Sequence, residues 1–102
     1  MAISSIEHRG SWYDIYDDRG KKQKTLPDHI GEVLGWSSDF FILHKGSWYY
    51  ICDEDGHKEK TLPDHIGSFV SITGNRFIIR KGTWLYTYDR SGKKIDTRPV
   101  RR

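Results

Sequence analysis

Two Asp-His pairs have the most obvious chemical potential in this sequence, Asp28–His29 and Asp64–His65. Both lie in copies of one octapeptide, KTLPDHIG, whose starts are thirty-six positions apart. A carboxylate beside an imidazole is typical of acid–base catalysis and of metal binding. Metal ligands must converge on one ion, however, whereas adjacent residues on a loop point apart. We therefore expect no metal ion at these pairs.

Other signs of catalysis are weak. The sequence has no G-x-S-x-G motif that would supply an activated serine. Its one cysteine, Cys52, stands where the other copies of its segment carry Tyr16 and Tyr88, so we expect a packing role for it. The DEDG stretch (53–56) is acidic like the start of a calcium loop, but the later bidentate Glu is missing and a hairpin turn explains it better. We expect a protein that is not an enzyme and that uses no cofactor.

The doubled octapeptide belongs to a period of 36 residues that runs through the whole chain. The positions in triple register are Gly10, Gly46 and Gly82; Trp12, Trp48 and Trp84; Asp17, Asp53 and Asp89; Gly20, Gly56 and Gly92; Lys22, Lys58 and Lys94; Thr25, Thr61 and Thr97; and Pro27, Pro63 and Pro99. In the third copy the octapeptide has changed to DTRPV. A fixed period of this length indicates a repeat architecture, in which each unit buries its apolar faces against its neighbours.

Each unit is predicted to contain four short β-strands. In the third copy they are 67–74 (GSFVSITG), 76–82 (RFIIRKG), 83–89 (TWLYTYD) and 93–99 (KKIDTRP). The third strand of each copy is rich in aromatic and β-branched residues and is followed by an Asp-x-x-Gly turn. No segment has a sustained 3.6-residue period, so no long helix is expected. The first ten residues align only with the second strand, which leaves the first copy one strand short.

The third strand has two apolar faces, because Trp48, Tyr50 and Cys52 alternate with Tyr49 and Ile51. Such a strand is typical of sheets stacked face to face, which cover it on both sides. Apolar residues make up only 35% of the chain and aromatic residues 14%, so large aromatic side chains are expected to build the core. The three recurring tryptophans are the expected anchors of that core. Replacing Trp48 with Ala should then cost about 3–5 kcal/mol and prevent folding.

The four-stranded unit resembles a short β-propeller blade, in which a strand, a polar turn, an aromatic strand and a YDxxGK-type hairpin recur. This resemblance implies one all-β domain, 1–102, made of three antiparallel repeats at about 1–30, 31–66 and 67–102. Because propellers close with four to eight blades, three blades imply self-association, most simply a two-fold homodimer that forms a six-bladed ring. A monomeric β-trefoil is the alternative, and a twisted open meander is the third possibility.

In a blade, two kinds of loop lie at the same end, namely the junction between units and the loop between the second and third strands. The residues placed there are His8, Arg9, Asp28, His29, His44, Lys45, Asp64, His65, Arg80 and Lys81. This ring of cations and histidines with two aspartates would suit an anionic or polyhydroxylated ligand. Ordinary solvated loop residues, copied together with the unit, would give the same pattern.

The overall composition narrows the possible functions. Seventeen basic and fourteen acidic residues interleave, giving a net charge of +3, and the only local basic excess is Arg98, Arg101 and Arg102. One cysteine permits no intramolecular disulfide. The N-terminus has no signal-peptide pattern, and no stretch approaches the roughly 20 apolar residues of a membrane helix. We therefore expect a soluble cytoplasmic protein.

These features together predict a non-catalytic, self-assembling binding or scaffold module whose partner is a protein. A carbohydrate-binding module is one alternative, in which Trp12, Trp48 and Trp84 would serve as sugar platforms. A weak nucleic-acid binder that uses the basic loops and the arginine-rich tail is the other alternative.

Overall fold

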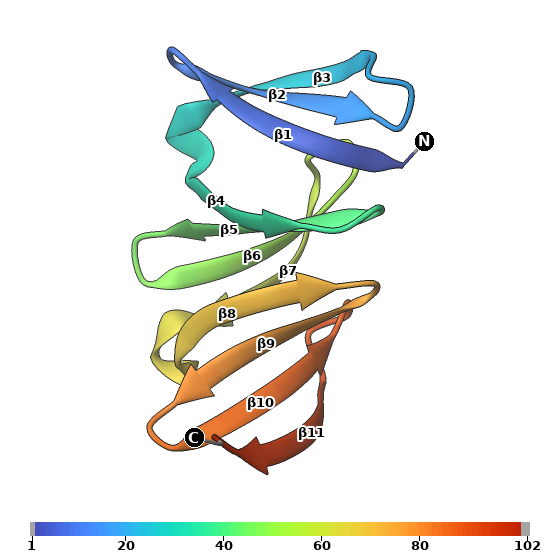
Figure 1. The fold of residues 1–102 in the computed structure, drawn as a ribbon. Helices are drawn as coiled ribbons and strands as arrows, with labels where there is room; N and C mark the ends of the chain where they lie inside the picture. Colours follow the sequence, from blue (N-terminus) through green and yellow to red (C-terminus); the bar gives the residue numbers. More distant parts are fainter. Residues whose placement is uncertain (1, 101–102) are drawn as a thin grey trace.

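The computed structural model describes residues 2–100 and shows an all-β chain in which each repeat forms one antiparallel sheet (Figure 1). Arg101 and Arg102 of the basic tail lie outside the described residues. Within residues 2–100 no α-helix forms, and no helix is long and apolar enough to span a membrane. The expected all-β class and the three-repeat organisation are confirmed.

Each sheet follows the order of its strands in the sequence. The first sheet contains β1 (Ile3–Arg9), β2 (Trp12–Asp17) and β3 (Lys22–Pro27). The second contains β4 (Glu32–Trp36), β5 (Phe40–Lys45), β6 (Trp48–Asp53) and β7 (Lys58–Pro63). The third contains β8 (Ser68–Thr73), β9 (Arg76–Lys81), β10 (Trp84–Asp89) and β11 (Lys94–Pro99). Two short 3₁₀ turns, η1 (Asp28–Ile30) and η2 (Asp64–Ile66), connect the sheets.

The Asp-x-x-Gly hairpins explain one part of the repeat. In the first hairpin the side-chain oxygen Oδ1 of Asp17 accepts hydrogen bonds from the backbone N–H groups of Arg19 and Lys21, both at 2.9 Å. The N–H of Lys21 contributes most to lowering the pKa of Asp17, and the N–H of Arg19 lowers it further, while burial opposes them. Gly20 closes the turn at a φ of +76°, in the left-handed region that glycine tolerates without strain. The same aspartate and glycine positions recur in all three copies because each hairpin needs them.

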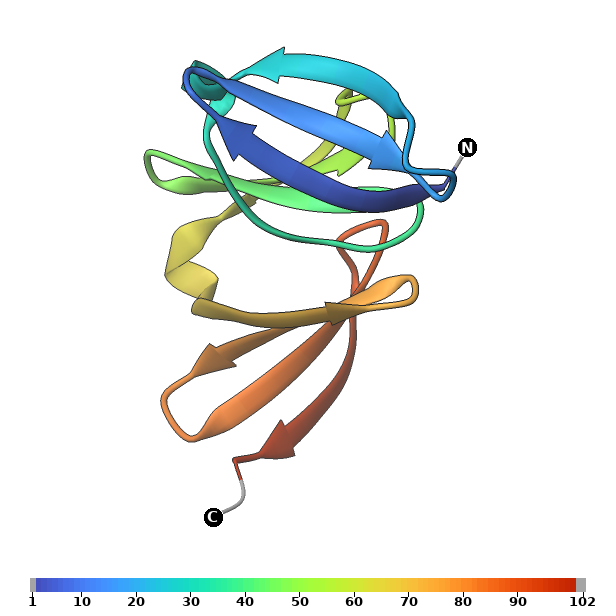
Figure 2. The same cartoon turned by 45° about the horizontal axis from the view of Figure 1, so that its top comes forward.

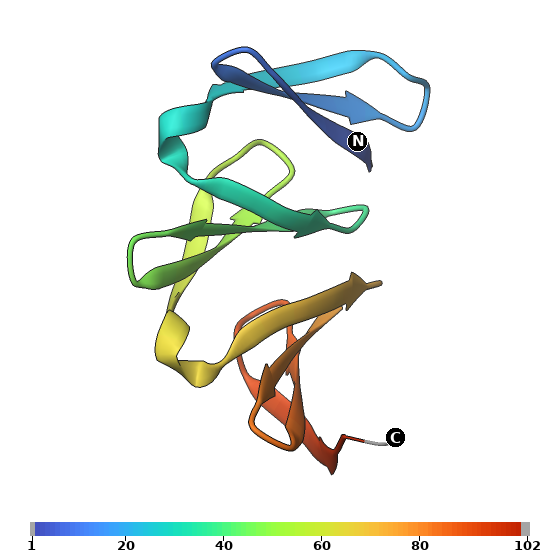
Figure 3. The ribbon, with the colours of Figure 1, turned by 60° about the vertical axis from the view of Figure 1, so that its left-hand side comes forward.

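The three sheets stack face to face, as Figures 2 and 3 show from two further directions. One core cluster fills the junction between the first and second sheets, and another fills the junction between the second and third. The second sheet contributes to both clusters, since Phe41 and Leu43 face the first sheet while Phe40 and Ile42 face the third. The prediction that the aromatic third strand is covered on both sides therefore holds for β6, where Ile51 and Cys52 are both fully buried.

The strands β1, β4 and β8 lie along one side of the stack, and β4 has both β1 and β8 beside it. Gly35 in β4 allows the close approach, because a Cβ atom there would lie 2.9 Å from the ring of Phe69 and 3.0 Å from Ile72. Every strand ladder among the described residues pairs strands of the same repeat. Each repeat therefore forms its own separate antiparallel sheet.

The missing strand of the first sheet leaves β1 as an edge. Trp36, whose counterpart one period later is Ile72, covers part of this edge by donating its indole N–H to the carbonyl of Ser4 at 3.2 Å. The N–H of Ile3 donates to the carbonyl of Ser38 at 2.6 Å. The second sheet thus satisfies backbone groups that a fourth strand would otherwise have paired.

The prediction that the recurring tryptophans anchor the core is wrong. Trp12, Trp48 and Trp84 are 50%, 45% and 46% exposed, and the buried core consists mainly of Phe and Ile side chains. Each of these tryptophans is the first residue of its strand and so lies at the end of its sheet. Their recurrence in register is not explained by core packing.

Candidate ligand-binding end

The two kinds of loop expected at one end of each blade do meet there. His8, near the end of β1, and Asp28, in η1, place Nε2 and Oδ2 3.1 Å apart. One repeat later the same atoms of His44 and Asp64 are 3.0 Å apart. Each aspartate thus pairs with a histidine twenty residues before it, and not with the histidine that follows it in sequence.

The octapeptide has a structural reason to be conserved between the two copies. Pro27 is extended before η1, and the N–H of Asp28 then donates to the carbonyl of Ser11 at 2.9 Å. The second copy repeats this with Asp64 and Ser47, also at 2.9 Å. Gly67 ends the second copy at a φ of +138°, where a Cβ atom would lie 2.4 Å from the carbonyl oxygen of Arg80. The octapeptide is therefore the connection that turns one sheet into the next.

The third repeat lacks the His–Asp pair. Arg80 occupies the histidine position and Val100 the aspartate position. The N–H of Val100 still donates to the carbonyl of Thr83 at 2.8 Å, so the backbone arrangement is retained. Arg80 turns back and donates from Nε to the carbonyl of Gly82 at 3.2 Å.

The basic residues of this end each make a different contact. Lys45 donates from Nζ to the carbonyl of His29 at 2.7 Å, which ties its loop to η1. Arg9 lies 3.2 Å from the buried carboxylate of Asp14. Lys81 and His65 line a shallow pocket between η2 and the third sheet. The structure therefore gathers the predicted residues into neighbouring loops, where several serve to hold the loops together.

The exposed tryptophans stand at the same end, and the sequence reasoning did not include them among the residues of this end. Trp12 lies opposite Arg9 on β1 and Pro27 on β3. The second repeat places Trp48 opposite Lys45 and Pro63, and the third places Trp84 opposite Lys81 and Pro99. Directly opposed residues of antiparallel strands share one face of the sheet. We call each indole with its cation and its proline a tryptophan station.

Two further cations lie over tyrosine rings of the same strands. The ammonium of Lys58 lies 4.1 Å from the ring centre of Tyr50, and that of Lys94 lies 4.5 Å from the ring centre of Tyr86. These tyrosines are two residues beyond Trp48 and Trp84, on the same face of their strands. Both tyrosines pack against the core clusters at the junctions with the preceding sheets, so these two lysines cover aromatic rings at the junctions.

The remaining reactive side chains have structural roles. Cys52 is fully buried, and this burial raises its pKa to about 12, so the sulfur stays a thiol at neutral pH. Asp53, Asp55 and His57 bring three potential metal-ligating atoms within 4.8 Å of one another. In this group Oδ1 of Asp53 already accepts the N–H groups of Asp55 and His57, which is the same hairpin contact that Asp17 makes. The predicted turn role of DEDG accounts for this cluster.

Comparison of the whole chain with family models, with curated proteins and with solved structures finds no match.

Proposed function

We propose that the protein is a non-catalytic binding module whose ligand lies across the tryptophan stations and whose open stack of sheets is completed by a second copy. The observation that carries the binding role is the half-exposed indole in each of three repeats, each opposite a cation and a proline. Keeping three large apolar rings in water costs solvation free energy, and a ligand that covers them recovers it.

A protein segment is the ligand that this composition favours. Tryptophan and arginine are enriched among the residues that dominate the binding energy of protein interfaces. The cations Arg9, Lys45 and Lys81 stand beside the indoles. These charges favour a segment that carries acidic side chains between apolar ones.

A carbohydrate is the second candidate, and the same indoles favour it. A flat, exposed aromatic ring in every repeat is suited to stacking on the apolar face of a sugar ring. A glycan, however, gives the cations beside each indole no charge to match unless it is itself acidic. A protein segment therefore remains the first proposal.

The binding role can be tested by selection from a random peptide library. Wild-type protein serves as bait, and a variant with Trp12→Ala, Trp48→Ala and Trp84→Ala serves as the counter-selection bait. We expect enriched peptides that are acidic and apolar, with affinity for the variant at least tenfold weaker. A matched control replaces Trp36, which lies apart from the stations, with Ala. Binding of neutral oligosaccharides that depends on the three tryptophans, without peptide binding, would favour the carbohydrate alternative.

Completion by a second copy rests on the incomplete stack. Within residues 2–100 the first sheet has only three strands, and the outer faces of the first and third sheets have no sheet against them. Two chains would supply six sheets, a number at which propeller-like rings close. Light scattering on a sizing column should give twice the 12.0 kDa mass of one chain. A mass of one chain would contradict this part of the proposal.

A further inference from the structure

The outer faces of the first and third sheets differ in chemistry from the faces buried between sheets. The period of 36 residues identifies which position on an outer face corresponds to which position at an internal junction. On the third sheet, Arg76 stands where the second sheet has Phe40, and Arg98 stands where it has Leu62. Both Phe40 and Leu62 belong to the apolar cluster between the second and third sheets. The free face has therefore exchanged apolar side chains for arginine.

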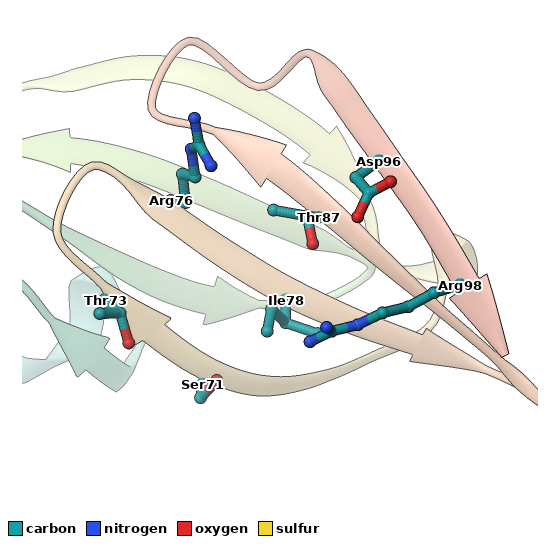
Figure 4. Close-up of a pocket in the computed structure, with 7 residues that line it drawn as sticks. All are labelled: Ser71, Thr73, Arg76, Ile78, Thr87, Asp96 and Arg98. Carbon is teal, nitrogen blue, oxygen red and sulfur yellow. The ribbon is translucent and has the colours of Figure 1, made fainter. Parts of the chain in front are cut away.

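Figure 4 shows this outer face of the third sheet, where Arg98 extends across the strands toward Ile78 and Arg76 stands near the hairpin end. Thr87 lies between them in the place that Ile51 has in the second sheet. These residues line one shallow hollow together with Asp96, Ser71 and Thr73. The face keeps an apolar centre at Ile78 and is rimmed by two exposed arginines.

The outer face of the first sheet carries acidic side chains, whereas the outer face of the third sheet carries arginines. Asp14 stands where the second and third sheets have Tyr50 and Tyr86. Asp14 is 1% exposed, and its Oδ1 accepts a hydrogen bond from the hydroxyl of Thr25 at 3.0 Å. Within residues 2–100 its Oδ2 accepts no hydrogen bond, and its ion-pair partner Arg9 is largely exposed. At the hairpin tip, the exposed Asp18 stands where the second sheet has Glu54 and the third sheet has Arg90. This face therefore carries an acidic side chain at both positions, and the one at Asp14 is particular to the first sheet.

The internal junction shows that one pair of these positions meets, and that a second pair packs against the same cluster. Between the second and third sheets the ring of Phe40 lies 6.5 Å from that of Phe77, and the guanidinium of Arg90 lies 5.9 Å from the ring of Phe40. Leu62 and Tyr86 pack against the same core cluster. If a third sheet met a first sheet in the same way, Arg76 would occupy the place of Phe40 and Asp18 that of Arg90. Arg98 and Asp14 would likewise replace Leu62 and Tyr86.

We propose that the outer face of the third sheet of one chain binds the outer face of the first sheet of a second chain, with Arg76 opposite Asp18 and with Arg98 and Asp14 in the same junction. This inference rests on the ring closure proposed above and names the surfaces that form it. A face that only had to remain in water would need polar residues, but it would not need opposite charges at corresponding positions. Two-fold symmetry makes both junctions of the ring identical.

Charge reversal tests the junction. Arg76→Glu and Asp18→Arg each place like charges at both junctions of a homodimer, so we expect the dimer of either variant to dissociate with a Kd at least tenfold higher. A 1:1 mixture of the two variants restores opposite charges at both junctions, and we expect it to form a heterodimer as tight as the wild-type dimer. Arginine is compatible with the hairpin at position 18, since Arg90 occupies the same turn position in the third repeat.

The controls are charge reversals at two exposed positions that do not belong to the proposed junction. Glu32→Arg and Lys93→Glu change the net charge by the same amounts and should leave the dimer intact. Circular dichroism of each variant alone verifies that it is folded. A wild-type dimer that both reversals leave unchanged would overturn this junction but not the self-association itself. A monomeric wild-type chain would overturn both. Dissociation of each variant without recovery on mixing would also contradict the pairing.

Discussion

At the scale of single residues, position along the strand decides burial more than side-chain size does. Trp48 and Ile51 lie on the same strand three residues apart, yet Trp48 is 45% exposed and Ile51 is fully buried. The tryptophan starts the strand at the sheet end, whereas the isoleucine lies in its middle beneath the third sheet. Alternation of apolar residues along a strand cannot distinguish these two places.

This difference reverses the expected order of two substitutions. Trp48→Ala should cost only about 1–2 kcal/mol, because roughly half of the indole is already in water. Ile51→Ala should cost about 2–5 kcal/mol, because it leaves a cavity between two sheets. Urea unfolding followed by circular dichroism measures both free energies. A larger loss for Trp48→Ala than for Ile51→Ala would place the indoles in the core after all.

The His–Asp pairs also show what residue-level reasoning cannot reach. Asp28 and His29 are adjacent in the sequence, but the carboxylate of Asp28 contacts His8. The partner of Asp28 is not the adjacent His29 but His8, which lies twenty positions earlier. That partner follows only from the meeting of two loops.

At the scale of elements, the repeated octapeptide is a connection whose backbone is constrained by its neighbours. Gly31 and Gly67 end the two copies at φ values of +139° and +138°. A Cβ atom would lie 2.4 Å from the carbonyl oxygen of Arg80 at Gly67 and 3.0 Å from that of His44 at Gly31, so the adjacent sheet leaves little room for a side chain. Duplication explains why the octapeptide occurs twice, and this packing explains why its glycine could not drift.

Two glycine substitutions separate these effects. Gly67→Ala should cost about 3 kcal/mol or more, since its Cβ atom would meet the carbonyl oxygen of Arg80 at 2.4 Å. Gly74→Ala is the matched control, because its φ is +59° but a Cβ atom there meets nothing within 4 Å. The control should lose only about 1–2 kcal/mol for the left-handed backbone. Equal losses in thermal or urea unfolding would show that close packing at Gly67 is unimportant.

At the scale of the whole molecule, stability is concentrated in the second sheet. Its strands β5 and β6 pack against a sheet on either side, and the four residues from Phe40 to Leu43 are at most 1% exposed. The first and third sheets each have only one covered face in the single chain, and all of β11 is exposed. The central sheet of the stack is therefore the most buried, and the two outer sheets are more exposed to solvent.

Hydrogen exchange should report this gradient. We expect the backbone N–H groups of β5 and β6 to exchange slowest and those of β11 at least tenfold faster, because opening the centre requires both junctions to separate. NMR of the native protein at low concentration, where association is weak, measures these rates. Equal protection of β11 and β5 in the monomer would contradict the gradient.

The sequence by itself determined the repeat, the strand boundaries, the missing strand and the hairpin turns, because these depend on local residue type and on a period of 36. It also predicted which loops share one end, since alternating strands fix where each turn lies. Only the tertiary structure decided which aromatic residues are covered, which histidine meets which aspartate, and which faces are left without a neighbouring sheet. Each of these depends on how far one sheet overlaps the next, and overlap is a property of packed sheets that no single strand encodes.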